Sequence, residues 1–265
     1  MEELPPVLES LPDPPPPPAM SLAARLLNVF AIPGEVFEVV KASRVSTANW
    51  LLPMLLSGIV LAFSAVVAVS QPAVQKQMHE PFERWVKMLQ QEVKAGKVKQ
   101  ADVDRIVAVE QAITPHVLRV LFGGGAALFG VARVFWWALA LWLLGRGFLK
   151  VRLNFFKTLE VAGLAMMIGV LGGAVTLLLM LNLPDFVATR GLAQAVNDLD
   201  SLQKSPVSLA VSTVFALWFL VVLSVGLGRL ARVPLLRAAW FVFAFWLLQE
   251  SFLILLAGAL AQFAL

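Results

Sequence analysis

Cysteine and tyrosine are both absent from this chain of 265 residues. Without cysteine there is no disulfide, no thiolate metal site, no cysteine nucleophile and no palmitoylation site. Charged residues are also scarce, at 14% of the chain against about 25% in soluble domains. Hydrophobic residues fill the composition instead, at 59%. A chain this short cannot bury so much apolar surface in a single core, so its composition predicts a membrane protein.

A strong excess of one charge is lacking as well. The 21 lysines and arginines against 17 aspartates and glutamates give a net charge of +4. This modest excess falls in short loops, where it indicates membrane topology and not a nucleic-acid-binding stripe. Since tyrosine is absent, any aromatic belt at the membrane interface must be built from the 8 tryptophans. The composition therefore predicts the lipid bilayer as a partner and no nucleic acid.

Proline dominates the first segment, residues 1–20. Eight of the first 18 residues are proline, and the last five of these form the run 14–18. Such a run favours polyproline II, an extended spacer without internal hydrogen bonds. We expect a disordered tail, with a ligand for a proline-binding groove as the alternative. The start of the chain lacks the basic and apolar regions of a signal peptide.

Two short amphipathic helices should follow the tail and open a membrane domain over residues 21–265. Ser21 is a suitable N-cap for the first helix, and Pro33 suits the first position of the second. Each then repeats apolar residues at helical spacing: Leu22, Leu26, Val29 and Phe30 in the first, and Val36, Phe37 and Val40 in the second. Neither helix is long enough to span a bilayer, so we expect both to lie along the membrane surface.

Five apolar segments are each long enough to cross the membrane. About 20 residues of α-helix cross the hydrocarbon core of about 30 Å. We expect the spans at about 50–70, 122–144, 161–181, 207–228 and 238–263. The sequence therefore predicts an all-α, polytopic membrane protein with five transmembrane helices.

Lysine and arginine predict the orientation of these spans. Four basic residues lie in 146–157 and three in 229–237, two loops that fall on the same side of the membrane. Basic loops favour the cytoplasm, so we expect a cytoplasmic N-terminus and an extracytoplasmic C-terminus.

The loop 71–117 has a pattern of its own. Apolar residues recur at helical spacing in two stretches, and Gly96 between them is suited to end the first helix. The pattern predicts an extracytoplasmic helical hairpin. We expect it to pack on the outer face of the bundle, with a partner- or lipid-binding flap as the alternative.

Several strings of the sequence together carry a resemblance to a known family. They are Phe-Ala-Ile-Pro-Gly-Glu-Val-Phe at 30–37, Trp-Leu-Leu-Pro at 50–53, Asn-Phe-Phe-Lys-Thr-Leu-Glu-Val-Ala-Gly-Leu-Ala at 154–165, the segment 215–227, and Arg-Ala at 237–238. They resemble the Yip domain, found in five-span membrane proteins related to those that interact with Ypt and Rab GTPases, and the resemblance covers about residues 22–262.

The resemblance implies five helices, a cytoplasmic N-terminus and no enzymatic activity. The eukaryotic branch of the family is linked to Golgi and endoplasmic-reticulum traffic and carries an Asp-Leu-Tyr-Gly-Pro motif before the first span. This chain has no tyrosine and so departs from that motif. It is more similar to the bacterial branch, which implies the bacterial inner membrane as its location. The resemblance supplies no functional residue.

Residue sets typical of catalysis and of metal binding are missing from the sequence. His79 and His116 lie far apart with no second nitrogen ligand nearby, so neither predicts a zinc site. We expect no cofactor and no metal.

Gly169 and Gly173 form a small-residue motif in the third span. Such glycines let helices approach closely, either within the bundle, as we expect, or along a homodimer seam.

Two charges fall near the middle of predicted spans. Arg133 lies in the second span and Glu250 in the fifth, each about 16–18 Å from the cytoplasmic edge at 1.5 Å per residue. Charges at such depth usually face the protein interior and mark structural pairs or pathways. We expect them to pair; alternatively Arg133 stacks on Trp136 or Trp137 and Glu250 is protonated. Glu160 begins the third span, where the helix dipole favours an acid, so we assign it a structural role.

Three classes of function fit these observations to different degrees. A non-enzymatic scaffold or adaptor, acting on a membrane-protein partner or as a homo-oligomer, needs only the fold. A small transporter or channel for a solute, ion or lipid would use Arg133 and Glu250 along its path. A membrane enzyme would need a catalytic constellation, which the sequence does not offer. The sequence favours the scaffold.

Overall fold

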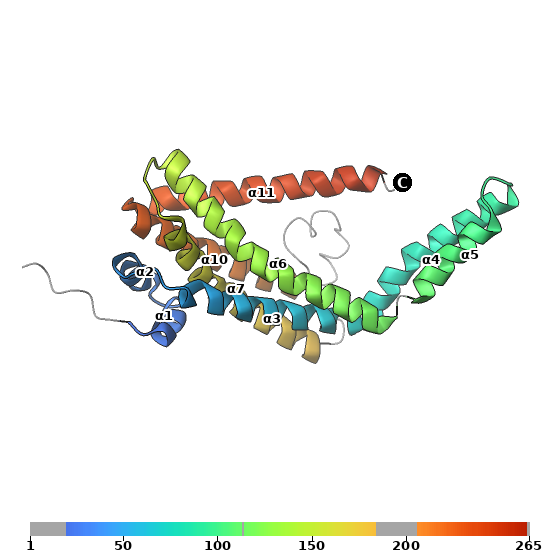
Figure 1. Cartoon of the computed structure of the whole chain (residues 1–265), viewed down its shortest axis with the longest axis horizontal. Coiled ribbons are helices and arrows are strands. Elements are labelled where there is room, and N and C mark those ends of the chain that lie inside the picture. The colour runs from blue at the N-terminus through green and yellow to red at the C-terminus, as the bar shows by residue number, and fades with distance from the viewer. Residues whose placement is uncertain (1–19, 113, 184–205, 264–265) are drawn as a thin grey trace, which may run out of the picture.

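The computed structural model describes residues 20–112, 114–183 and 206–263 (Figure 1). Within these residues the chain forms helices and no strand. Five of the helices are long and apolar enough to cross a membrane, as the sequence predicted. The proline-rich tail lies outside the described residues, apart from Met20.

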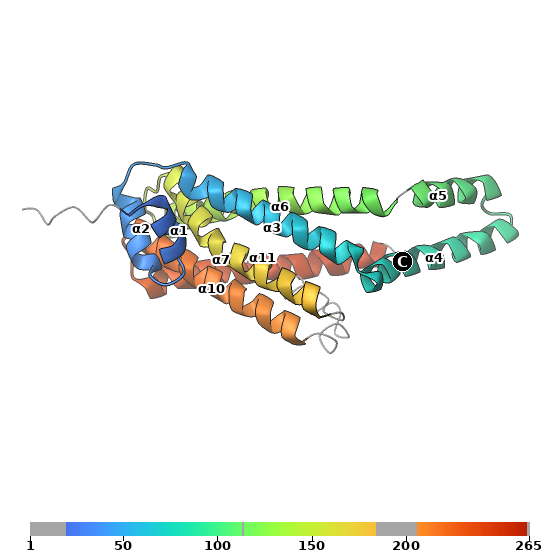
Figure 2. The same ribbon diagram turned by 90° about the horizontal axis from the view of Figure 1, so that it is seen from below.

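The two short helices predicted near the N-terminus are present. They are α1, Leu22–Asn28, and α2, Pro33–Ala42. The side chain of Ser21 accepts a hydrogen bond from the backbone N–H of Ala24 (3.2 Å), and Pro33 stands at the start of α2. Both predicted helix starts are therefore confirmed. The two helices lie across one end of the long helices, which we term the N-terminal end of the bundle (Figure 2).

The long helices run back and forth along one axis. They are α3 (Ala48–Ser70), α6 (Pro115–Leu143), α7 (Phe155–Asn182), α10 (Pro206–Ala231) and α11 (Leu235–Phe263). A single π-turn, η1 (Leu144–Phe148), extends α6. Because the number of crossings is odd, the chain ends at the opposite end of the bundle from α1 and α2 (Figure 1).

Two of these helices begin about six residues earlier than predicted, because polar caps fix their starts. Thr114 caps α6, where its hydroxyl accepts a hydrogen bond from the N–H of Val117 (3.4 Å). Asn154 caps α7 in the same way, by accepting from the N–H of Phe156 (2.9 Å). The hydropathy of a span marks its apolar centre, whereas caps mark its ends.

The packing is densest around α7 at the N-terminal end. Residues 158–166 of α7 are all buried. They contact α3, α6, α10 and α2, so α7 is the central helix of the bundle. The fifth span differs, since 6% of its most apolar stretch is buried compared with 33–39% in the other four. Figure 1 shows α11 beginning beside α10 and then diverging from the bundle.

The hairpin consists of α4 (Pro72–Lys94) and α5 (Gln100–Ala112). Gly96 ends α4 with a positive φ of 72°, as its position predicted. The expectation that the hairpin packs on the outer face of the bundle is wrong. The hairpin projects beyond the end of α3 and α6, and α4 and α5 contact each other (Figure 2). The apolar face of α4 is covered in part by α5, and α4 also contacts α3, the span that it follows.

Candidate functional site

A buried polar cluster ties the N-terminal end together; it consists of Arg25, Asn49, Lys157 and Glu160. The side chain of Glu160 is fully buried. Its Oε1 accepts hydrogen bonds from the backbone N–H of Ser46 and from Asn49 Nδ2, the latter at 3.3 Å. Its Oε2 lies 2.8 Å from Lys157 Nζ. A buried carboxylate is costly unless it is paired and hydrogen-bonded, and here both oxygens have partners.

The cluster extends from Glu160 to both short helices. Asn49 Oδ1 accepts a hydrogen bond from Arg25 Nη1 of α1 at 2.8 Å. Lys157 Nζ donates to the carbonyl oxygen of Val40 in α2 at 2.7 Å. The cluster thus joins α1, α2, α3 and α7, and Arg25 Nε is its one buried donor without a hydrogen-bond partner among the described residues.

The sequence indicated only part of this cluster. Glu160 was assigned a structural role as an acid in the first turn of a span, but α7 begins at Phe155, so Glu160 lies in its second turn. Its role comes from specific partners more than from the helix dipole. Lys157, three residues before Glu160, was a local signal for the ion pair. Arg25 and Asn49 lie more than 100 residues away in sequence, where no local signal connects them to Glu160.

A second contact at the same end joins α2 to α10. Arg229 Nη1 lies 3.1 Å from Glu38 Oε1, and Lys41 Nζ lies 3.5 Å from the other oxygen of Glu38. Gly34 leaves room for this arginine, because a Cβ at Gly34 would lie 3.1 Å from Arg229 Nη2. Phe37 of α2 is fully buried between α7 and α10. The short helices are therefore part of the folded bundle and do more than rest on the lipid surface.

Arg133, the first of the two predicted intramembrane charges, points into the bundle. Its guanidinium carbon lies 5.2 Å from the centre of the Phe219 ring of α10. Its Nη1 also lies beside Gly169 of α7, where an added Cβ would be 3.8 Å away. Neither neighbouring tryptophan covers it: Trp136 donates a hydrogen bond to Gln249 (2.6 Å), and Trp137 packs edge-on against Phe219.

Glu250, the second charge, lies on α11 and is partly buried. It lies within electrostatic range of Arg133. The direct ion pairs found among the described residues do not include these two side chains. The Arg133–Glu250 pair therefore stays a prediction.

The predicted packing glycines, Gly169 and Gly173, both face other helices of the same bundle. An added Cβ on Gly173 would lie 2.7 Å from a methyl group of Val60 in α3. Gly169 faces Arg133, as described above. Gly172, between them, faces Phe215 of α10 at 2.7 Å. These contacts favour packing within the bundle over a homodimer seam.

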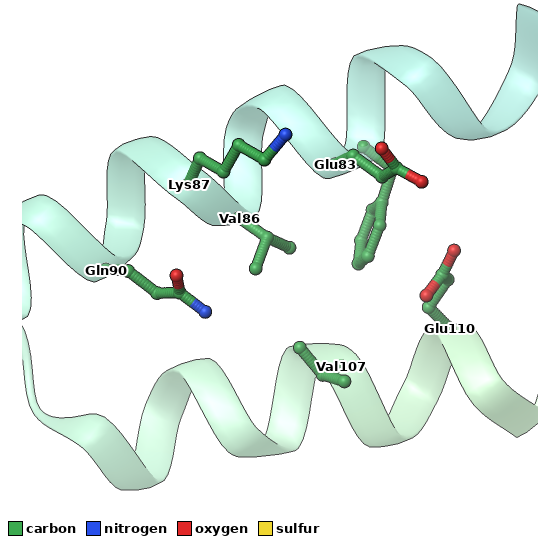
Figure 3. Close-up of a pocket in the computed structure, with 7 residues that line it drawn as sticks. Glu83, Val86, Lys87, Gln90, Val107 and Glu110 are labelled. Carbon is green, nitrogen blue, oxygen red and sulfur yellow. The ribbon is translucent and has the colours of Figure 1, made fainter.

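An open groove lies between the two helices of the hairpin, with a volume of about 300 Å³. Figure 3 shows its lining, with Val86 on α4 and Val107 on α5 pointing into the space between the helices. The sequence predicted the hairpin but not this groove. Its lining side chains are Phe82, Glu83, Val86, Lys87, Gln90, Val107 and Glu110.

Both histidines are exposed; His79 lies on α4 of the hairpin, and His116 follows the hairpin closely in sequence. Nδ1 of His79 lies 3.0 Å from Oε1 of Glu110, which links α4 to α5. His116 lies in the first turn of α6. In the part of the chain that the structure describes, no group of three histidine, aspartate or glutamate side chains is placed to hold a metal ion.

Comparison with known proteins decides the family. The family model of the Yip1 domain matches residues 27–257, which is most of the chain. The chain belongs to the Yip1 domain family. No curated protein and no solved structure matches it.

This Yip1 domain begins within α1 and ends within α11, so it contains all five spans and the hairpin. Membership and the five apolar helices together make the chain a multi-pass membrane protein with a lipid environment. Arg25 lies just before the match, whereas its partner Asn49 and the rest of the buried polar cluster lie inside it.

Proposed function

We propose that this Yip1 domain protein is a non-enzymatic scaffold or adaptor of the bacterial inner membrane. The bundle serves as the anchor, with the N-terminal end in the cytoplasm, and the hairpin presents a docking surface on the other side. A reporter fused after Leu265 should then read outside the cytoplasm and one inserted near Arg232 inside. The reverse pattern would contradict this orientation.

The projecting hairpin is the observation that carries this proposal. Its helix α4 has 23 residues, about 35 Å at 1.5 Å per residue, most of it beyond the bundle. Large apolar side chains remain exposed on the hairpin, including Trp85 (43%) and Met88 (57%) on α4 and Val109 (63%) on α5. Exposed apolar surface outside the membrane marks interaction sites more often than it serves stability.

The hairpin can be removed without pulling the spans apart. Arg119 Nε of α6 donates a hydrogen bond to Ser70 Oγ of α3 at 3.1 Å, so the two ends that the hairpin connects lie side by side. A flexible linker of about four residues in place of 72–112 can join them. A scaffold anchored by its bundle should keep its fold and its membrane insertion after this change.

The test of docking identifies what contacts the hairpin of the full chain in native membranes. A photo-crosslinking residue replaces Trp85 in the full chain, and a second one replaces Leu217 on the lipid-facing side of α10 as the control. The scaffold predicts defined protein adducts from position 85 and lipid adducts from position 217. If position 85 yields no protein adduct, the docking role of the hairpin is contradicted.

A transporter or channel is the second candidate, and one observation favours it. Arg133 is held inside the bundle against Phe219, and α11, which carries Glu250, is the least buried span. Charged side chains within membrane spans often mark the path of a substrate or an ion. Purified protein in liposomes should then conduct ions or move solutes, and Arg133→Leu should abolish the flux. The scaffold proposal predicts no flux from either protein.

A further inference from the structure

The groove of the hairpin combines an apolar floor with an acidic edge. Phe82, Val86 and Val107 supply apolar side chains from both helices. At one end of the groove the carboxylates of Glu83 and Glu110 face each other from α4 and α5 (Figure 3). Lys87 lines the α4 wall, but its ammonium group points away from α5 (Figure 3). The open space between the helices is therefore acidic at one end and apolar below.

The two carboxylates are not neutralised to the same extent. Glu110 contacts His79 at 3.0 Å and is about a quarter exposed, at 28% of its side chain. Glu83 has no ion-pair partner among the described residues, although it lines the same groove. A carboxylate with no partner beside an apolar hollow attracts a cation that carries an apolar group.

We propose that this groove binds a helical segment of a partner protein that presents an apolar side chain and, one turn away, a lysine or arginine. This inference rests on the proposed scaffold function and names the chemistry of its partner. The apolar side chain fills the space above Val86 and Val107. The cation then reaches Glu83 and Glu110, because residues four apart on a helix lie on the same face.

The volume of the groove agrees with such an anchor. About 300 Å³ is at the low end for a small-molecule site, and it is enough for one large aliphatic or aromatic side chain. Trp85, exposed on the same helix, packs edge-on against the groove-lining Phe82, with the two ring centres 5.9 Å apart, and offers the segment a further apolar contact. A central apolar anchor with a charged rim is the usual layout of a helix-binding surface.

The experiment uses the full chain in nanodiscs and a fluorescent, alanine-based helical peptide that carries leucine and lysine four residues apart. Two matched peptides carry leucine and glutamate, or alanine and lysine. Fluorescence anisotropy should show that the leucine–lysine peptide binds about tenfold more tightly than either of the others. Raising the salt concentration should weaken its binding, since the pairing charges are exposed.

Variants of the protein locate the binding to the groove. Glu83→Gln should weaken the leucine–lysine peptide about three- to fivefold, as expected for an exposed ion pair, and adding Glu110→Gln should weaken it further. Glu92→Gln, on the same helix but outside the groove, is the matched control and should leave binding unchanged. Circular dichroism checks that each variant keeps its helices.

Three results would overturn the proposal. The first is equal binding of all three peptides, and the second is equal binding to Glu83→Gln and to the unchanged protein. The third is association of two protein-containing nanodiscs with each other that is lost in Glu83→Gln, because the groove would then bind a second copy of this chain. If the peptides fail these tests but position 85 still forms protein adducts, only the proposed chemistry of the partner is contradicted. Loss of those adducts removes the scaffold function as well.

Discussion

At the N-terminal end of the bundle, five helices pack around α7 and even a glutamate is buried; at the hairpin end, two helices project beyond the bundle. Glu160 is fully buried at the first end, with partners for both of its oxygens. At the second end Glu83 and Glu110 face an open groove. The same residue type thus fixes helices where it is enclosed and stays available to a ligand where it is not.

This difference also explains how the bundle tolerates a weakly held fifth span. Three other spans and the two short helices pack around α7, whereas α11 contacts α10 and the aromatic residues of α6. Stability in proteins is not uniform, and elements with few buried contacts open at the lowest free energy. We therefore expect the N-terminal end to dominate the free energy of unfolding and α11 to contribute little.

Replacing Glu160 should have the largest effect, because it removes the centre of the buried polar cluster. Glu160→Leu leaves the half-buried Lys157 without its carboxylate partner, and we expect a loss of about 3 kcal/mol in the free energy of unfolding. Changing Lys157 to Met in the same protein should recover part of that loss. Unfolding in mixed detergent micelles measures both.

Glu35 on α2 provides the matched control for Glu160. It is exposed on α2, one of the short helices that the cluster holds. Glu35→Leu should change the free energy of unfolding by less than about 0.5 kcal/mol. If Glu160→Leu is no worse than this control, the cluster does not hold the N-terminal end together.

Adding a methyl group to a glycine gives the most direct comparison of the packing at the two ends of the bundle. A Cβ on Gly163 would lie 2.3 Å from Trp50 Cα and 2.9 Å from the Asn49 carbonyl oxygen, so α3 and α7 must move apart. Gly163→Ala should cost about 1–3 kcal/mol of unfolding free energy. Gly124→Ala, toward the hairpin end of α6, meets nothing within 4 Å and should not destabilise. Similar losses at both positions would contradict the packing difference.

The sequence predicted what depends on neighbours along the chain. The five spans follow from hydropathy, and Ser21, Pro33 and Gly96 act on helix ends within a few residues of themselves. Each of these features is local, so one sequence is enough to find it.

Contacts between distant segments were beyond the reach of these patterns. The hydrogen bond between Asn49 and Glu160 joins residues 111 positions apart. Periodicity likewise showed that the hairpin has an apolar face, but not which element covers it. The predicted packing on the bundle failed for that reason, because α4 and α5 cover each other in part. Arg133 was found by its depth alone, whereas its neighbour Phe219 had no signal in the sequence.

The Arg133–Glu250 pair tests how far the loosely held span is coupled to the rest. Arg133→Leu and Glu250→Leu should each destabilise, and the double variant should recover about 0.5–3 kcal/mol relative to the sum of the two. Such a coupling energy would show that α11 is held electrostatically at mid-membrane. Losses that add within about 0.5 kcal/mol would leave Arg133 held by Phe219 without help from Glu250.

The smallest expected effect concerns the hydrogen bond that joins α11 to α6. Trp136 Nε1 donates to Gln249 Oε1 at 2.6 Å, one residue before Glu250. Hydrogen bonds between membrane helices contribute about 0.6 kcal/mol on average, because the separated helices find other partners. Gln249→Leu should therefore lower the free energy of unfolding by about that amount, and Trp136→Phe should do the same. A double variant no worse than either single change would assign the loss to this bond. A loss of several kcal/mol would mean that α11 is held as firmly as the N-terminal end, against the contrast in burial between the spans.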